Sequence, residues 1–154
     1  MAGIGGTDYR RGAYDRLNDA FALLRSQRFG GSVYLAGRSV EGMLRALIWH
    51  GDAEYRTGKK TLDTGHDLRK MLALVRSLRV FKDQELEDAT TDDVQKVARL
   101  WLNNMRFLAN EKIEATWYNL GEIDRRRRTM KKAATEFCDA GAIVIKRCEV
   151  IWLR

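Results

Sequence analysis

Hydrophobic positions recur at helical spacing between Val33 and His50. At about 100° per residue, the apolar side chains of this segment fall on one broad face, which consists of Val33, Ala36, Val40, Met43, Leu44 and Leu47. A second stripe lies almost opposite and consists of Tyr34, Arg38, Glu41, Arg45 and Trp49. The pattern predicts a helix with one face in a protein core and a second face, here called the mixed stripe, of unusual composition.

The same spacing predicts helices in other parts of the chain. The periodic segments are residues 12–27, 33–51, 68–78, 90–108 and 129–152, and a less regular stretch covers 109–124. These helices predict an all-α fold. Because the connections between them are short, we expect an up-and-down bundle of four long helices plus one shorter helix. We expect residues 1–11 to be a flexible N-terminal leader and residues 12–154 to form a single domain.

Helix-breaking and helix-capping residues predict where these helices begin. Gly30-Gly31 breaks the pattern, so Ser32 is expected to cap the second helix. Residues 51–65 are polar and predict a loop, after which Asp67, or Thr64 just before it, is suited to cap the third helix. Residues 82–89 are predicted to form an acidic connection between the third and fourth helices. Thr90 and Asp93 then have the spacing of a capping box for the fourth helix.

Composition narrows the class of protein. The chain has 154 residues, no proline and 45% hydrophobic residues, and its formal net charge is +7. A basic surface of this kind favours a nucleic-acid or other phosphate-bearing partner. No apolar run approaches the ~20 residues of a membrane span, and two cysteines without a ligand cluster predict neither a zinc site nor a disulfide framework. We expect a cytoplasmic protein with no cofactor, no metal and no membrane association.

The densest charge is the run Arg125, Arg126, Arg127 and Arg128. It lies where a helix is predicted to begin, and the positive end of a helix dipole disfavours cations. Glu122, Asp124, solvent or a bound phosphate could compensate. The run is therefore interpreted either as a solvated turn or as a grip on a nucleic-acid backbone.

The mixed stripe and the two histidines are the other candidates for function. Glu41 lies three residues from Arg38 and four from Arg45, so it can pair with both. The stripe could be a surface salt-bridge ladder, but tyrosine, tryptophan and arginine are the types enriched at interface centres. We expect it to line a dimer interface or a groove beside it. His66, next to Asp67, is either a contact at a helix start or a general base.

Four segments stand out in order along the chain: "SVYLAGRSVEGMLRALI", "GHDLRKML", "LWLNNMRF" and "AATEFCDAGAIVIKRCEVIW". In this order they resemble the HEPN domain family of bacterial toxin–antitoxin and phage-defence modules, and the resemblance covers most of the chain from Phe29 to Trp152. It implies a bundle of four to five helices that usually dimerises. Active members are metal-independent ribonucleases with an R-x4-6-H motif, whose histidine moves the proton of the RNA 2′-hydroxyl and whose arginine holds the phosphate.

The chain departs from that motif. The matching arginine aligns best with Arg106, but no histidine follows it, and Asn110 cannot transfer protons near neutral pH. A literal match, Arg45 with His50, lies in the second helix instead. The sequence therefore favours a non-catalytic HEPN-like homodimer that binds RNA or a partner protein, with Arg106 and the arginine run as nucleic-acid contacts.

Two alternatives stay open. One is a metal-independent ribonuclease that uses Arg45 with His50, or Arg106 with His66. The other is a purely protein-binding subunit paired with a nucleotidyltransferase.

Overall fold

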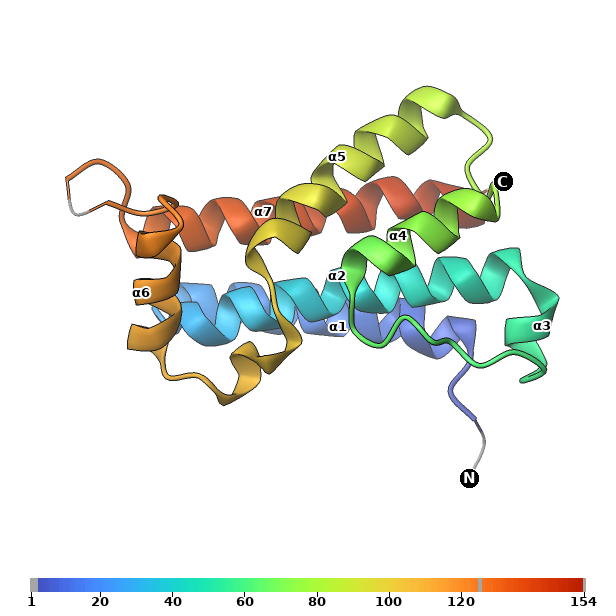
Figure 1. Ribbon diagram of the computed structural model, residues 1–154, viewed down its shortest axis with the longest axis horizontal. Coiled ribbons are helices and arrows are strands. Elements are labelled where there is room, and N and C mark those ends of the chain that lie inside the picture. Colours follow the sequence, from blue (N-terminus) through green and yellow to red (C-terminus); the bar gives the residue numbers. More distant parts are fainter. Residues whose placement is uncertain (1–2, 125, 154) are drawn as a thin grey trace.

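The computed structural model describes residues 3–124 and 126–153, and these residues form helices joined by short loops (Figure 1). No strand occurs among them. The elements are α1 Gly6–Arg25, α2 Phe29–Gly51, α3 Ala53–Arg56, α4 Leu68–Ser77, α5 Gln84–Leu100, η1 Asn103–Phe107, α6 Asn110–Asn119, α7 Met130–Glu149 and η2 Val150–Leu153, where η marks a 3₁₀ helix. The all-α class expected from the sequence is confirmed.

Helix α2 is the centre of the bundle. It packs against α1, α4 and α7 (Figure 1). The six apolar residues that define its predicted inner face are all completely buried. Burial of such side chains stabilises a fold by roughly 1.5–3 kcal/mol each, so this face is a principal contributor to the core.

The four long helices alternate in direction along the chain. Arg10 near the start of α1 pairs with Glu149 at the end of α7, and the Sγ atom of Cys138 in α7 lies 3.8 Å from the carbonyl oxygen of Ser32 in α2. Arg147 at the end of α7 donates to the carbonyl oxygen of Ala89 near the start of α5, at 2.8 Å. Helices α2 and α7 are therefore parallel to each other and antiparallel to α1 and α5.

The first two helices begin earlier than the sequence indicated. Helix α1 starts at Gly6, so the expectation of a flexible leader over 1–11 is wrong from that residue on. Helix α2 starts at Phe29, so Gly30-Gly31 is not a break. A Cβ atom at Gly30 would lie 2.1 Å from the Oδ1 atom of Asn110, which shows that this glycine allows close packing. Ser32 is buried and donates to the carbonyl oxygen of Phe29 instead of capping the helix.

Helix α5 is displaced relative to the predicted fourth helix. The carboxylate of Asp83 caps it. The segment 82–89, which was predicted to be a connection, supplies its first turns. Thr90 and Asp93 are buried within the helix, so the predicted capping box is wrong. The acidic residues of this segment stabilise the positive end of the helix dipole, which explains why they belong to a helix start.

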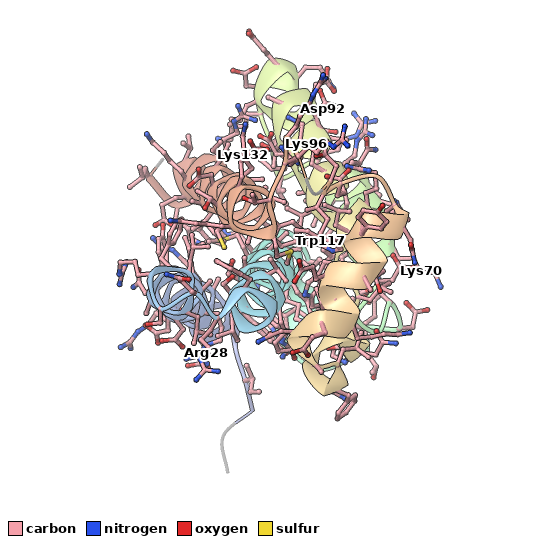
Figure 2. All side chains as sticks on the ribbon, turned by 90° about the vertical axis from the view of Figure 1, so that its left-hand side faces the viewer. Arg28, Lys70, Asp92, Lys96, Trp117 and Lys132 are labelled. Carbon is pink, nitrogen blue, oxygen red and sulfur yellow. The ribbon has the colours of Figure 1, made fainter. Side chains whose placement is uncertain are left out.

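Other boundaries were predicted more closely. Asp67 caps α4 as expected, because its Oδ1 atom accepts from the backbone N–H groups of Arg69 and Lys70 at 2.9 and 3.1 Å. Thr129 caps α7. The predicted loop over 51–65 contains the short helix α3, and the irregular stretch 109–124 contains α6, whose Trp117 points into the core (Figure 2).

Trp101 holds the end of α5 against α2. Its indole ring lies over Gly37, stacks on the ring of Tyr34 at 6.2 Å, and donates from Nε1 to the carbonyl oxygen of Tyr34 at 3.0 Å. A Cβ atom at position 37 would be 2.1 Å from the indole. The absence of a side chain there lets the chain leave α5 across the surface of α2.

The two cysteines are inert parts of the core. Cys138 and Cys148 are free and buried, and burial raises the pKa of each thiol to about 12. Within the described residues, no group of histidine, cysteine and carboxylate side chains could hold a metal ion. None of the helices in the described ranges combines the length and apolarity needed to cross a membrane.

We predict that Gly37→Ala destabilises the protein by about 2 kcal/mol, because the new methyl group overpacks the contact with Trp101. Gly12→Ala is the matched control, since no atom lies within 4 Å of its added Cβ. That variant should stabilise α1 by roughly 0.5–1 kcal/mol, the ordinary gain of alanine over glycine in a helix. Urea denaturation measures both, and equal effects would contradict the packing argument.

Candidate functional site

A buried carboxylate organises the mixed stripe of α2. Glu41 is only 2% exposed, and its oxygens accept hydrogen bonds from Nη1 of Arg38 at 2.7 Å and from Nε of Arg45 at 3.0 Å. The same carboxylate lies 2.8 Å from Nδ1 of His66. We call these four residues the Glu41 cluster. Three donors satisfy a charge that would otherwise be costly to bury.

The cluster positions the loop that precedes α4. Nη2 of Arg45 donates to the carbonyl oxygen of Gly65 at 2.8 Å, and Gly65 has a left-handed φ of +58° that suits glycine. His66 follows directly, and Asp67 then caps α4. The imidazole is therefore fixed from two sides, by the carboxylate on α2 and by the start of α4.

The hydrogen bond with Glu41 determines which nitrogen of His66 carries a proton. A carboxylate can only accept, so Nδ1 must donate. In the neutral imidazole this leaves Nε2 with its lone pair, and the side chain is 42% exposed. Nη1 of Arg38 lies 3.3 Å from Nδ1, and both atoms are donors that share the same carboxylate. The arrangement suits His66 for accepting a proton from a ligand.

The cluster also carries surplus positive charge. Arg38 and Arg45 bring two guanidinium groups to one carboxylate, and Arg38 keeps 34% of its side chain exposed. Because exposed charge attracts an anion, the outer edge of the cluster favours a phosphate group.

A pocket of about 310 Å³ adjoins His66 between the start of α4 and the end of α5. Its lining includes Arg69 and Trp101. Two further lining residues, Thr64 and Asn103, each have an enclosed side-chain oxygen without a hydrogen-bond partner among the described residues. Unsatisfied buried polar atoms are rare in proteins, and a local rearrangement would be needed for these two to reach a ligand.

The outer face of α4 continues the positive charge. Its inner face consists of Leu68, Met71, Leu72 and Val75, which leaves Arg69, Lys70 and Arg76 exposed. Lys70 extends away from the molecule (Figure 2). In the described part of the chain, neither Arg69 nor Lys70 has a side-chain partner. These cations were not among the candidates predicted from the sequence. They could have been found there, because every charged residue on the polar face of this predicted helix is basic.

The aromatic ends of the mixed stripe have partners within the chain. Tyr34 stacks on Trp101, and Trp49 contacts Tyr9 and Tyr55 with ring centroids 5.2 and 5.8 Å apart. That the stripe lines a dimer interface or a groove beside it stays a prediction, and within it Glu41 is buried inside the chain. Packing within one chain accounts for the unusual composition of the stripe.

The residue pairs proposed for a ribonuclease motif are not assembled. Arg45 points to Glu41 and Gly65, whereas the ring of His50 lies 5.6 Å from that of Trp152. The guanidinium of Arg106 lies over Phe107, and within the described ranges no hydrogen bond or ion pair joins it to His66. The structure instead joins Arg45 to His66 through Glu41.

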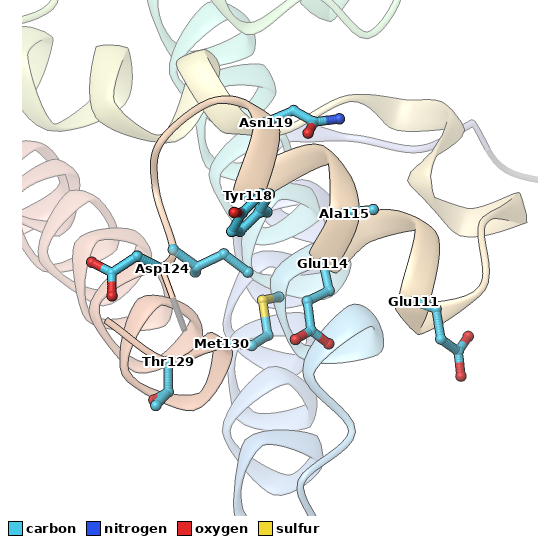
Figure 3. Close-up of a pocket in the computed structure, with 9 residues that line it drawn as sticks. Glu111, Glu114, Ala115, Tyr118, Asn119, Asp124, Thr129 and Met130 are labelled. Atoms are coloured by element: carbon cyan, nitrogen blue, oxygen red, sulfur yellow. The ribbon is translucent and has the colours of Figure 1, made fainter. Parts of the chain in front are cut away.

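Residues Arg126 and Arg127 of the arginine run form a bend before α7. Oδ1 of Asp124 accepts from the backbone N–H groups of Arg126, Arg127 and Arg128, and these bonds lower the pKa of Asp124. The side chain of Arg128 pairs with Glu136 and Glu122, while Arg125 lies outside the described residues. A nearby pocket of about 450 Å³ is lined by Tyr118, Met130 and three acidic residues (Figure 3), a poor setting for a phosphate.

Comparison with protein-family models, with curated proteins and with solved structures gives no match.

We predict that Glu41→Gln destabilises the protein by on the order of 3 kcal/mol, because Arg38 and Arg45 lose their counter-charge and the new, buried amide presents donors to them. Asp19→Asn is the control, since Asp19 pairs with Arg16 on the exposed surface of α1. It should cost less than about 1 kcal/mol. Guanidinium chloride would screen these charges, so urea denaturation is the measurement, and similar costs for both variants would contradict the assigned role of Glu41.

Proposed function

We propose that this protein is a HEPN-like helical module that binds single-stranded RNA along the outer face of α4. The observation that carries the proposal is the Glu41 cluster, whose carboxylate leaves Arg38 and His66 half-exposed with surplus positive charge. The unpaired cations Arg69 and Lys70 follow within one turn. Together they form a short cationic surface spaced for a nucleic-acid backbone.

Two features favour RNA over other polyanions. The adjoining pocket of about 310 Å³ has His66 and Trp101 in its lining, which suits an unstacked base, and sequence-specific RNA recognition uses such splayed bases. The segments "SVYLAGRSVEGMLRALI" and "GHDLRKML" that carry the HEPN resemblance also contain the whole Glu41 cluster. A role in a toxin–antitoxin or phage-defence system, as a homodimer, is part of this proposal.

We predict that the double variant Arg69→Gln, Lys70→Gln weakens binding of a single-stranded 20-nucleotide RNA about tenfold at 50 mM KCl. Loss of two phosphate contacts should also reduce the slope of log affinity against log salt by about 1.4. Fluorescence anisotropy between 50 and 200 mM KCl measures both quantities.

The matched control is the double variant Arg11→Gln, Arg25→Gln, which removes two exposed charges from α1 on the other side of α2 (Figure 1). An equal loss in this control would show that net charge alone drives binding. If the unmodified protein does not bind RNA even at 50 mM KCl, the alternative of a purely protein-binding subunit is favoured.

A second candidate function is metal-independent RNA cleavage by His66. The Glu41–His66 hydrogen bond favours it, because Nδ1 donates to the carboxylate and Nε2 is left as a proton acceptor, while Arg38 lies on the Nδ1 side of the ring. His66 would take the proton of the 2′-hydroxyl as its oxygen attacks phosphorus. The bond between phosphorus and O5′ then breaks, and O5′ takes a proton from water. This assignment needs neither His50 nor Arg106.

We predict for this candidate that the protein cleaves labelled RNA in EDTA and that His66→Ala slows cleavage at least 100-fold, the usual contribution of general acid–base catalysis. His50→Ala should leave the rate unchanged, because its ring packs on Trp152. DNA of the same sequence should resist, since it has no 2′-hydroxyl. Absence of cleavage by the unmodified protein would exclude this candidate and leave the binding proposal intact.

A further inference from the structure

A second basic pocket lies at the opposite end of α4. It has a volume of about 590 Å³ and is bounded by the residues that leave α4 and by Gln84, the first residue of α5. Three cations line it, Arg76, Arg79 and Lys82, together with the carboxylate of Glu87. The ten residues of α4 span about 15 Å, so this pocket is separate from the Glu41 cluster.

Two of the three cations are unpaired. Nε of Arg76 donates to Oε1 of Glu87 at 3.0 Å. The side chains of Arg79 and Lys82 have no hydrogen-bond or ion-pair partner among the described residues. The pocket therefore has a surplus of two positive charges. The negative end of the α4 dipole would explain a cation in the last turn, such as Arg76, but not Lys82, which lies five residues beyond the helix.

Arg79 occupies a position that ordinarily favours glycine. It follows Leu78, the C-cap residue of α4, and its φ of +51° is left-handed. Glycine would adopt this backbone without steric cost, whereas arginine is strained there. The strained backbone fixes the start of the arginine side chain at the pocket.

We propose that this pocket binds a terminal phosphate group, carried by a free nucleotide or by the 5′ end of an RNA. The planar guanidinium of Arg79 can donate two parallel hydrogen bonds to phosphate oxygens, and the ammonium of Lys82 supplies a second charge. The two surplus charges match a phosphate dianion. This site does not depend on the RNA-binding surface proposed for the start of α4.

The test is titration of the whole protein with inorganic pyrophosphate by isothermal titration calorimetry at pH 7.5 and 50 mM KCl. We expect saturable binding that weakens at least tenfold in Arg79→Gly and in Lys82→Met. Arg79→Gly should at the same time raise Tm by about 2–4 °C, because it relieves the left-handed strain. Weaker binding by a more stable variant cannot result from partial unfolding.

Gln27→Gly is the matched control. Gln27 follows the end of α1 with a φ of +59°, so its replacement should raise Tm similarly and leave pyrophosphate affinity unchanged. The variant Arg69→Gln, Lys70→Gln should also bind pyrophosphate normally, which separates this site from the proposed RNA surface. No saturable binding, unchanged affinity in Arg79→Gly, or equal loss in Gln27→Gly would overturn the proposal.

Two further titrations identify the source of the phosphate. Preference for a 5′-phosphorylated over a 5′-hydroxyl oligoribonucleotide, lost in Arg79→Gly, assigns the pocket to RNA ends. ATP binding that depends on Arg79 without such a preference assigns it to nucleotides. If neither ligand depends on Arg79, the proposal is wrong.

Discussion

The burial of one carboxylate, Glu41, constrains the rest of the structure. A glutamate that is 2% exposed must have its charge compensated, because an unpaired buried ion costs several kcal/mol. Arg38 and Arg45 compensate it from the same helix, and His66 does so from a distant part of the chain. The loop before α4 must therefore lie on α2, and the start of α4 is fixed with it.

Helix α2 serves the core and the candidate site through opposite faces. Its apolar face meets α1 and α7, while its mixed stripe receives the loop, the indole of Trp101 and the ring of Tyr9. Small residues on α2 let its neighbours approach closely, as Gly37 does for Trp101. The geometry of the Glu41 cluster thus depends on the packing of the bundle, which gives a rigid support to side chains that face solvent.

Sequence periodicity predicted the helical class, the inner face of α2 and the cap at Asp67, because these depend on local spacing. It failed where a residue serves a distant contact: Gly30 makes room for Asn110 rather than ending a helix. Spacing along α2 also predicted that Glu41 could pair with two arginines. It could not predict the third partner, since His66 lies 25 residues away, nor that the pairing is buried.

A dense run of charged residues in the sequence need not leave free charge on the protein surface. The arginine run is the densest part of the chain, yet Asp124 binds its backbone and Glu136 binds Arg128. Helix α4 has fewer cations, but its inner face takes the apolar residues and its outer face carries no acidic residue. Apart from Arg76, which pairs with Glu87, its positive charges therefore add along one surface instead of being cancelled. For this reason both proposed phosphate sites lie at the ends of α4 and not at the arginine run.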